Sequence, residues 1–203
     1  MILYYIHDPM CSWCWGFESC KQALFEKLPA DITVKYLLGG LASDTNEVMP
    51  DAMQQMLQQT WKNIEQRIPG KKFNFDFWTS NNPIRSTYPA CRAVIAARKQ
   101  NRSHEMIHTI QQAYYQRAMN PSHNDVLINL ADELDMNVVA FRKDLVSTET
   151  QQQLEAEIFQ AHDLNVDSFP ALVLDFNRSH RRIPVDYINP TPMFDLINNL
   201  TES

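Results

Sequence analysis

Two cysteines separated by two residues, Cys11 and Cys14, follow closely on a short apolar run at the start of the chain. Residues 2–6 are typical of a buried strand, and Pro9 ends that strand because proline cannot donate to the ladder. Beyond the cysteines, apolar side chains recur at helical spacing, which predicts a helix over about 12–27. The pair is therefore expected where a strand ends and a helix begins.

A second strand is expected directly after this helix. Pro29 ends the helical pattern, and residues 32–38 form another apolar run that Gly39 and Gly40 close. The order of strand, C-x-x-C, helix and strand opens a βαβ unit, whose crossover makes its two strands parallel. The start of the chain therefore predicts an α/β fold.

The long middle region has a different character. Between about residues 45 and 165, strand signals nearly vanish and helical periods take over. Strand character then returns in two short runs separated by a polar turn at 177–180, and a last helical pattern closes the chain. The expected helices of the middle region are 47–67, 89–99, 104–117, 124–134, 138–145 and 150–162, followed by strands at 171–174 and 182–185 and a helix at 193–200.

This order predicts a thioredoxin fold that is interrupted after its second strand. We expect a thioredoxin-like domain made of residues 1–44 and 166–203, with residues 45–165 as an all-helical domain inserted between the second and third strands. Glycine is scarce, and no Ser/Gly-rich run or block of like charges could serve as a flexible linker. The chain is therefore expected to form one compact unit.

Charge and hydropathy exclude several classes of function. The formal net charge is -6, and the basic clusters Lys71-Lys72 and Arg181-Arg182 are short and not interleaved with aromatic residues, so a nucleic-acid partner is not expected. No stretch approaches the roughly 18 uncharged apolar residues of a membrane span, and the N-terminus shows no secretory leader. We expect a cytoplasmic protein that does not use a membrane.

The C-x-x-C pair has two chemical interpretations, a redox dithiol and half of a zinc site. Four cysteines in a chain of 203 residues are too few for a framework of structural disulfides. A closed zinc site needs four ligands, and the best second pair, His104 and His108, has no nearby cysteine or acid motif. The redox interpretation is favoured, with no metal and no bound cofactor beyond the redox-active disulfide itself.

The expected position of the two cysteines suits disulfide exchange. Three residues apart on a helix, their side chains share one face, where two sulfurs can bond to each other or exchange with a substrate disulfide. Cys11 at the helix start faces free backbone N–H groups and the positive end of the helix dipole, which favour thiolate over thiol. Cys11 is thus the expected nucleophile and Cys14 the resolving residue, with Trp13 and Trp15 as an aromatic rim.

The segment of residues 8–16, Asp-Pro-Met-Cys-Ser-Trp-Cys-Trp-Gly, resembles the active-site segment of the DsbA family of thioredoxin-fold proteins. The nearest branch is the FrnE-like group of predicted protein disulfide isomerases, in which an Asp precedes C-x-W-C and an aromatic-Gly follows. That family also carries an all-helical domain between the second and third strands, so the resemblance covers most of the chain. It implies protein thiols and disulfides as substrates, with Ser12 and Trp13 among the substrate-binding residues.

The family's second hallmark is a cis-proline at the start of the third strand, packed beside the cysteines. Residues 166–173 fit that place, with Pro170 as the proline. A proline entering a strand removes one ladder donor, and a cis X-Pro bond costs only about 1 kcal/mol. The resemblance implies that Phe169 and Pro170 shape the substrate groove; from the residues alone, a trans-proline in a loop is equally open.

Two features depart from the family. Most oxidising members are exported, whereas this N-terminus shows no signal, which leaves the direction of electron flow open because a reducing cytosol keeps such pairs as dithiols. The residue before the proline, Phe169, is bulky where smaller or β-branched residues are common. Glutathione is a candidate reductant for the pair.

The positions of three further side chains indicate their roles. Asp8 resembles the family's acid at the end of the first strand, where it either relays a proton to Cys14 or caps the turn into the helix. Cys20 lies about 240° round the helix from Cys14, so it is expected to be a small buried residue. Cys91 begins a helix of the insertion, and a redox role for it stays open.

Three functions are consistent with these residues. The first is a thiol–disulfide oxidoreductase or disulfide isomerase acting on protein substrates. The second is a glutathione-dependent kappa-type isomerase or transferase, although such relatives usually keep a Ser where Cys11 stands and need no second cysteine. The third is a non-catalytic module that binds unfolded clients through its aromatic rim and leaves the cysteines idle. The sequence predicts no oligomeric state.

Overall fold

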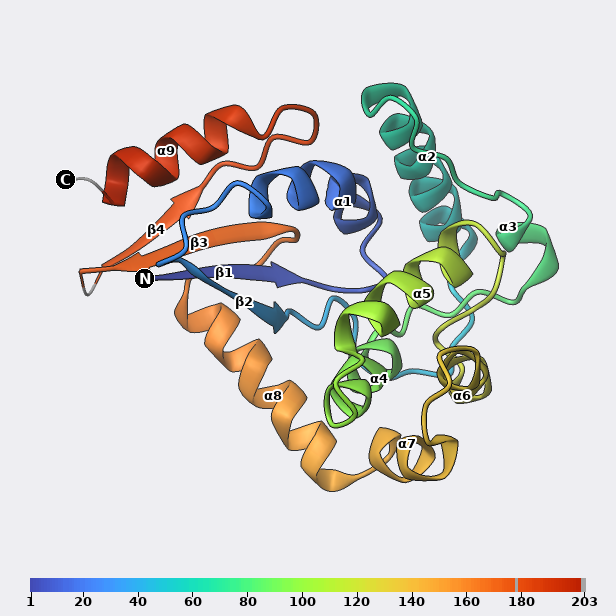
Figure 1. Cartoon of the computed structure of the whole chain (residues 1–203). Coiled ribbons are helices and arrows are strands. Elements are labelled where there is room, and N and C mark those ends of the chain that lie inside the picture. Colours follow the sequence, from blue (N-terminus) through green and yellow to red (C-terminus); the bar gives the residue numbers. More distant parts are fainter. Residues whose placement is uncertain (178, 202–203) are drawn as a thin grey trace.

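The computed structural model describes residues 1–177 and 179–201, which form a mixed α/β architecture on one four-stranded sheet (Figure 1). The strands are β1 (Ile2–His7), β2 (Thr33–Leu38), β3 (Ala171–Phe176) and β4 (Ser179–Ile183). Their order in the sheet is β2-β1-β3-β4, with β1 parallel to β2 and antiparallel to β3, which is antiparallel to β4. The predicted parallel pairing of the first two strands is confirmed.

Helices cover both faces of the sheet. Along β1, Leu3 points to one face and Tyr4 to the other, as the alternation of a strand requires. The first face is packed by α1 (Ser12–Phe25) and α9 (Thr191–Thr201), and the opposite face by α8 (Thr148–Asp163) (Figure 1). Both faces of β1 are therefore buried, which explains its continuously apolar sequence.

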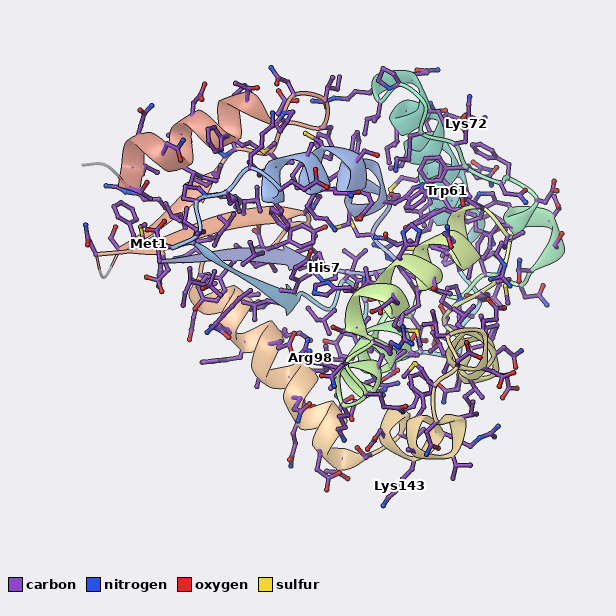
Figure 2. All side chains as sticks on the ribbon, viewed as in Figure 1. Met1, His7, Trp61, Lys72, Arg98 and Lys143 are labelled. Atoms are coloured by element: carbon purple, nitrogen blue, oxygen red, sulfur yellow. The ribbon has the colours of Figure 1, made fainter. Side chains whose placement is uncertain are left out.

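The remaining helices gather at the end of the sheet where β1 finishes (Figure 1). They surround an aromatic core around Trp61, whose ring centre lies 4.9 Å from that of Trp78 and 5.0 Å from that of Phe73. Figure 2 places Trp61 inside this region and His7 at its border with the sheet. These helices are α2 (Asp51–Arg67), α3 (Phe77–Ser80), α4 (Tyr88–Arg98), α5 (Ser103–Tyr115), α6 (Asn124–Glu133) and α7 (Val138–Leu145).

The core of the helical region is continuous with the part of the chain that carries the cysteines. It includes Met10 and Trp15 on either side of Cys11, and Leu38 at the end of β2. Helix α8, which the predicted division assigns to the insertion, packs against the sheet through Ala161. The division of the chain into a thioredoxin-like domain and an inserted helical domain stays a prediction.

Most predicted elements end within a few residues of the observed ones, but the terminal hairpin differs. The strand predicted at 182–185 starts too late, because β4 begins at Ser179, which pairs with Phe176 and leaves a shorter turn. Helix α3 was not expected, since four residues are too few to show a helical period. Arg178 in the predicted turn and residues 202–203 of the predicted domain lie outside the described residues.

Candidate active site

Cys11 stands at the amino end of α1. The chain turns immediately after β1, with the Cys11 N–H donating to the Asp8 carbonyl at 3.0 Å. Cys11 is the N-cap residue: its backbone is extended, its carbonyl accepts the Trp15 N–H at 3.1 Å, and no side chain caps the helix. No side chain therefore caps the first N–H groups of α1, and Cys11 stands at this end of the helix.

Cys14 lies one turn further along α1 and is sealed from solvent. The exposed fraction is 6% for Cys11 and 0% for Cys14. Their side chains are in hydrogen-bonding contact as two free thiols. Burial raises the pKa of Cys14 well above its ordinary value, and the contact with Cys11 adds to the rise. The pair is asymmetric, because an external group reaches Cys11 first while Cys14 is held as a buried thiol.

The segment before β3 lies against Cys11. The peptide bond between Phe169 and Pro170 is cis, which confirms the conformation implied by the family resemblance. The Cys11 thiol donates to the Phe169 carbonyl at 3.4 Å. Pro170 is buried and β3 begins at the next residue, so the sheet itself sets the position of Phe169 relative to α1.

Gly39 leaves the space that the Phe169 ring occupies. The Gly39 N–H donates to the His7 carbonyl at 2.7 Å, just beyond the last paired residues of β1 and β2. A methyl group at this position would overlap the Phe169 ring. The sequence marks Gly39 only as a strand end, and its contact with Phe169 is a tertiary one that sequence reasoning missed.

The rim beside Cys11 is aromatic and carries a positive charge. Trp13 is half-buried, and its ring centre lies 5.0 Å from that of Tyr187. The Arg67 guanidinium lies 5.7 Å from the centre of the Trp13 ring and 5.5 Å from that of Tyr187. Ser12 is half-buried beside them. Arg67 and Tyr187 were not predicted, because they come from α2 and from the segment after β4, far from the C-x-x-C pair in sequence.

Trp15 is not part of this rim, and its predicted position is wrong. It is 5% exposed, and its ring stacks on Tyr115 with centres 5.8 Å apart. The Lys71 ammonium lies 3.9 Å from the centre of the same ring. Residues two apart on a helix point about 200° apart, so Trp13 and Trp15 cannot both face the rim.

The side chains of Asp8 and Cys91 are joined by a hydrogen bond close to the redox pair. Asp8 is fully buried, and its Oδ1 accepts the Met10 N–H at 2.8 Å, which is the geometry of a turn cap. Its Oδ2 accepts the Cys91 thiol at 3.4 Å, so the helical region reaches the residue that precedes the cysteines. Burial raises the pKa of Asp8, and its hydrogen bonds oppose that rise. A proton relay from Cys14 to Asp8 stays a prediction.

Cys20 lies away from the pair. It is buried on the α9 side of α1, where its thiol donates to the Asp186 carbonyl at 3.1 Å.

Within residues 1–177 and 179–201, no three His, Cys, Asp or Glu side chains are grouped so that they could hold a metal ion. In the same described ranges, no helix combines the length and the hydropathy that crossing a membrane requires.

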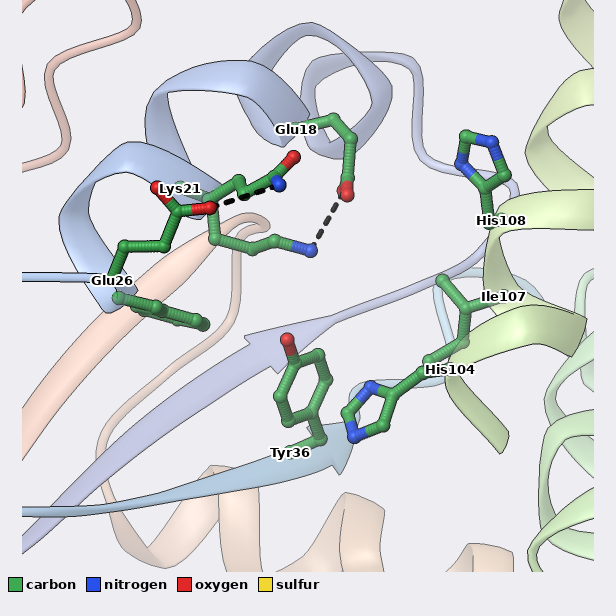
Figure 3. A pocket seen from close by; sticks show the side chains of 9 residues that line it. Glu18, Lys21, Glu26, Tyr36, His104, Ile107 and His108 are labelled. Carbon is green, nitrogen blue, oxygen red and sulfur yellow. Dashed lines mark hydrogen bonds and ion pairs between the residues drawn. The ribbon is translucent and has the colours of Figure 1, made fainter. Parts of the chain in front are cut away.

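A cavity of about 440 Å³ lies between α1 and α5 (Figure 3). On its α1 wall, Lys21 and Glu18 form an ion pair of 2.7 Å. On its α5 wall, His104 packs edge-on against Tyr36, with ring centres 4.6 Å apart, and His108 stands one turn further on. Its lining residues come from α1 and its C-cap Glu26, from β2 and from α5, and they do not include the cysteine pair, so the candidate redox chemistry lies elsewhere.

A family model described as thioredoxin matches residues 4–194. The chain belongs to the thioredoxin family. This thioredoxin-family chain is similar to a protein of Nitrosomonas europaea described as a candidate protein disulfide isomerase, with 26% identity and a TM-score of 0.85 over 99% of this chain and 97% of that one. The cytosolic disulfide reductase DsbM from Pseudomonas aeruginosa, also solved with GSH, shares the fold at 20% identity and a TM-score of 0.77, over 100% of this chain and 99% of that one.

The thioredoxin fold with a helical insertion is thereby confirmed, and DsbA of Xylella fastidiosa and DsbA of Pseudomonas aeruginosa share this fold at 12% and 14% identity. Among curated proteins, the ClpXP adapter protein SpxH of Bacillus subtilis is 24% identical over 192 residues. The match covers 91% of this thioredoxin-family chain but 62% of the relative, so the chain spans less than two thirds of that protein's length.

Proposed function

We propose that this thioredoxin-family protein is a thiol–disulfide oxidoreductase or disulfide isomerase acting on protein substrates, with Cys11 as nucleophile and Cys14 as resolving residue. The observation that carries the proposal is the Cys11 thiol at the amino end of α1, 3.4 Å from the Phe169 carbonyl. A buried second thiol one turn away supplies the partner for intramolecular exchange. The similarity to the Nitrosomonas europaea protein supports the same activity.

The exchange proceeds in two steps. The Cys11 thiolate attacks one sulfur of a substrate disulfide, which forms a mixed disulfide, and the other substrate sulfur leaves as a thiolate that takes up a proton. Cys14 then loses its proton and attacks the Sγ of Cys11, which forms the Cys11–Cys14 disulfide and releases the second substrate thiol. The substrate gains two electrons and the protein loses two. In isomerisation, a substrate thiol attacks the mixed disulfide instead and the pair leaves reduced.

Ser12, Trp13, Phe169 and Pro170 are the proposed substrate-binding residues. The half-buried Trp13 ring offers apolar surface to a partly unfolded client next to Cys11. The Phe169 backbone lies beside the Cys11 thiol and immediately before β3, where an extended substrate segment can pair with it. The groove thus presents the attacking sulfur to backbone-bound, extended clients.

The proposed direction of electron flow is reduction of the substrate in the cytosol, with glutathione as reductant. Two glutathione thiols would lose two electrons and become glutathione disulfide while the pair returns to the dithiol. DsbM, named a cytosolic disulfide reductase and solved with GSH, supports this choice. Arg67 at the rim provides a positive charge suited to the carboxylates of glutathione. The assignment to the FrnE-like branch belongs to the same proposal.

The curated relatives favour a second candidate function, a binding role. They are named ClpXP adapter proteins, and a chain with this function could hold a protein partner on its aromatic rim without redox turnover.

The kappa-type alternative is weaker. Cys14 contacts Cys11 and is buried beside it, and a reaction that needs one hydroxyl or thiol at the position of Cys11 has no use for that second thiol.

The Cys14→Ser variant tests the proposal directly, because it removes the resolving thiol and leaves the attacking one. Incubated with scrambled ribonuclease, it should accumulate a mixed disulfide at Cys11, detected by non-reducing electrophoresis and mass spectrometry. Cys11→Ser should trap nothing and lose insulin reduction with glutathione, while Cys20→Ala, another buried cysteine of α1, should retain it.

Each alternative predicts a different outcome. Insulin reduction that persists in Cys11→Ser would remove the oxidoreductase proposal. Glutathione-linked conversion of a small substrate by that variant would favour the kappa-type reaction. A wild-type protein without exchange activity, together with undiminished partner binding by Cys11→Ala, would favour the adapter role.

A further inference from the structure

Asp8 connects the redox pair to the helical region. Its buried carboxyl lies where three segments meet: the turn before α1, the loop after β2 and the start of α4. Oδ1 accepts the Met10 N–H at 2.8 Å. Oδ2 accepts the Leu41 N–H at 2.8 Å, the Thr87 hydroxyl at 2.6 Å and the Cys91 thiol at 3.4 Å. Thr87 precedes α4 and Cys91 lies in its first turn, so both side-chain donors come from the helical region.

Both side chains are held as donors to Asp8. The Thr87 Oγ1 accepts the Ala42 N–H at 3.1 Å, and its hydroxyl lies closer to the Asp8 carboxyl, at 2.6 Å, than to the Ala42 carbonyl, at 3.4 Å. Cys91 is fully buried, and burial raises its pKa well above the ordinary value, so it stays a thiol and a donor. Each donor favours the carboxylate form of Asp8 and opposes the burial that raises the pKa of Asp8.

The titratable side chains that interact with Asp8 from α1, α4 and α5 are uncharged at neutral pH, because their ordinary pKa values already lie above 7 and burial raises them further. The hydrogen bonds that Asp8 accepts therefore oppose its burial without help from a nearby cation: the Thr87 hydroxyl contributes most, followed by the Leu41 and Met10 N–H groups and the Cys91 thiol. These titratable groups are Cys14 on α1, Tyr88 and Cys91 on α4, and Tyr114 and Tyr115 on α5.

We propose that Thr87 and Cys91 are positioning residues that keep the Asp8 carboxylate able to accept the proton of Cys14 in the resolving step. The inference rests on the proposed function. The Cys14 thiol gives its proton to Asp8, its sulfur bonds to Cys11, and the bond between Cys11 and the substrate sulfur breaks. The leaving substrate thiolate then takes up a proton. The backbone of Asp8 contacts Cys14 and lowers the pKa of its thiol, whereas the charge of the Asp8 carboxylate raises that pKa.

The consequence is that a helix of the inserted region sets the pH at which the redox pair resolves. Removing a donor to a carboxylate raises the pKa of that carboxyl. The pH below which the rate of the resolving step falls therefore moves to a higher value. If Thr87 and Cys91 had a purely structural role, their removal would change the stability of the fold but not the pH dependence of the resolving step.

Cys91→Ala and Cys91→Ser form the central pair of variants, because the first removes the donor and the second replaces it with a hydroxyl. Thr87→Val removes the shorter bond. Cys20→Ala is the matched control, since it also deletes a buried thiol that donates to an oxygen, the Asp186 carbonyl, away from Asp8. Two quantities are measured: the pKa of Asp8 by NMR of carboxyl-labelled protein, and the pH dependence of resolution of a preformed mixed disulfide at Cys11.

The expected result is that Thr87→Val raises the pKa of Asp8 by about one, and that Cys91→Ala raises it by about half as much. The resolution profile should move to higher pH by the same amounts, Cys91→Ser should return both quantities to the wild-type values or below, and Cys20→Ala should change neither. Cys91→Ala with wild-type values in both measurements overturns the inference. If the wild-type protein resolves no mixed disulfide, the proposed function is wrong instead, and the NMR measurement still gives the pKa of Asp8 in each variant.

Discussion

The Cys11 thiol lies 3.4 Å from the Phe169 carbonyl, although 158 positions separate the two residues. The contact joins the amino end of α1 to the segment that enters β3. β1 leads into α1 and pairs with β3, so the sheet holds the two parts of the contact in place. In the proposed function, this geometry defines the side from which a substrate disulfide would reach Cys11.

Gly39→Ala should impair exchange with protein substrates, because the added methyl group overlaps the Phe169 ring and displaces it. Insulin reduction should fall on the order of 10-fold to 100-fold, as expected when a substrate-positioning group shifts by about 1 Å. Alkylation of Cys11 by iodoacetamide, which needs no groove, should keep its wild-type rate. An equal loss in both assays would show that the fold rather than the groove is damaged.

Asp8→Asn should become more stable relative to the wild type as the pH rises. Burial raises the pKa of Asp8 in the folded state, so folding favours the protonated carboxyl. That stabilisation is complete below the unfolded-state pKa of about 4 and is lost as the pH rises through the higher folded-state value. Urea unfolding should be measured from pH 4 to 8. The free energy of unfolding of the variant minus that of the wild type should increase as the pH rises. A constant or opposite difference contradicts the direction of the shift.

Iodoacetamide should modify Cys11 ahead of the other cysteines in the native protein. Cys14 and Cys91 are fully buried, and Cys20 is held by a hydrogen bond to a carbonyl, with burial raising its pKa to about 11. Cys11 stands at the uncapped amino end of α1 and keeps 6% of its surface exposed. Peptide mass spectrometry after brief labelling at neutral pH measures the order, with labelling in urea as the control. Native labelling of Cys14 at the rate of Cys11 would contradict the observed asymmetry.

Arg67→Gln should slow reduction of the oxidised pair by glutathione about two- to fivefold at low salt, since an exposed charge contributes modestly. The guanidinium lies over the Trp13 and Tyr187 rings, where it can attract the carboxylates of glutathione. Reduction by 2-mercaptoethanol, which is uncharged, should be unaffected, and the effect should shrink at high salt. Lys62→Gln, which removes an exposed charge elsewhere on α2, is the control. A loss that is equal for both reductants would assign Arg67 to packing of the rim.

The sequence alone determined most of the elements and the position of the C-x-x-C pair. The apolar run, the C-x-x-C pair and the helical spacing that follows are local patterns, and they specified β1, α1 and the place of Cys11 at a helix start. Such patterns depend on the period of the backbone, which neighbouring residues establish without help from the rest of the chain. The family resemblance added the cis bond before Pro170, which no periodicity shows.

Only the tertiary structure decided which side chains surround the two cysteines. Gly39 against Phe169, Arg67 over Trp13, and the donors from α4 to Asp8 are contacts between segments far apart in sequence. Their formation depends on how helices pack on the sheet and on one another, and a one-dimensional pattern carries no record of that packing. For the same reason the pattern could not assign Trp15 to the core, because its burial depends on a neighbour from α5.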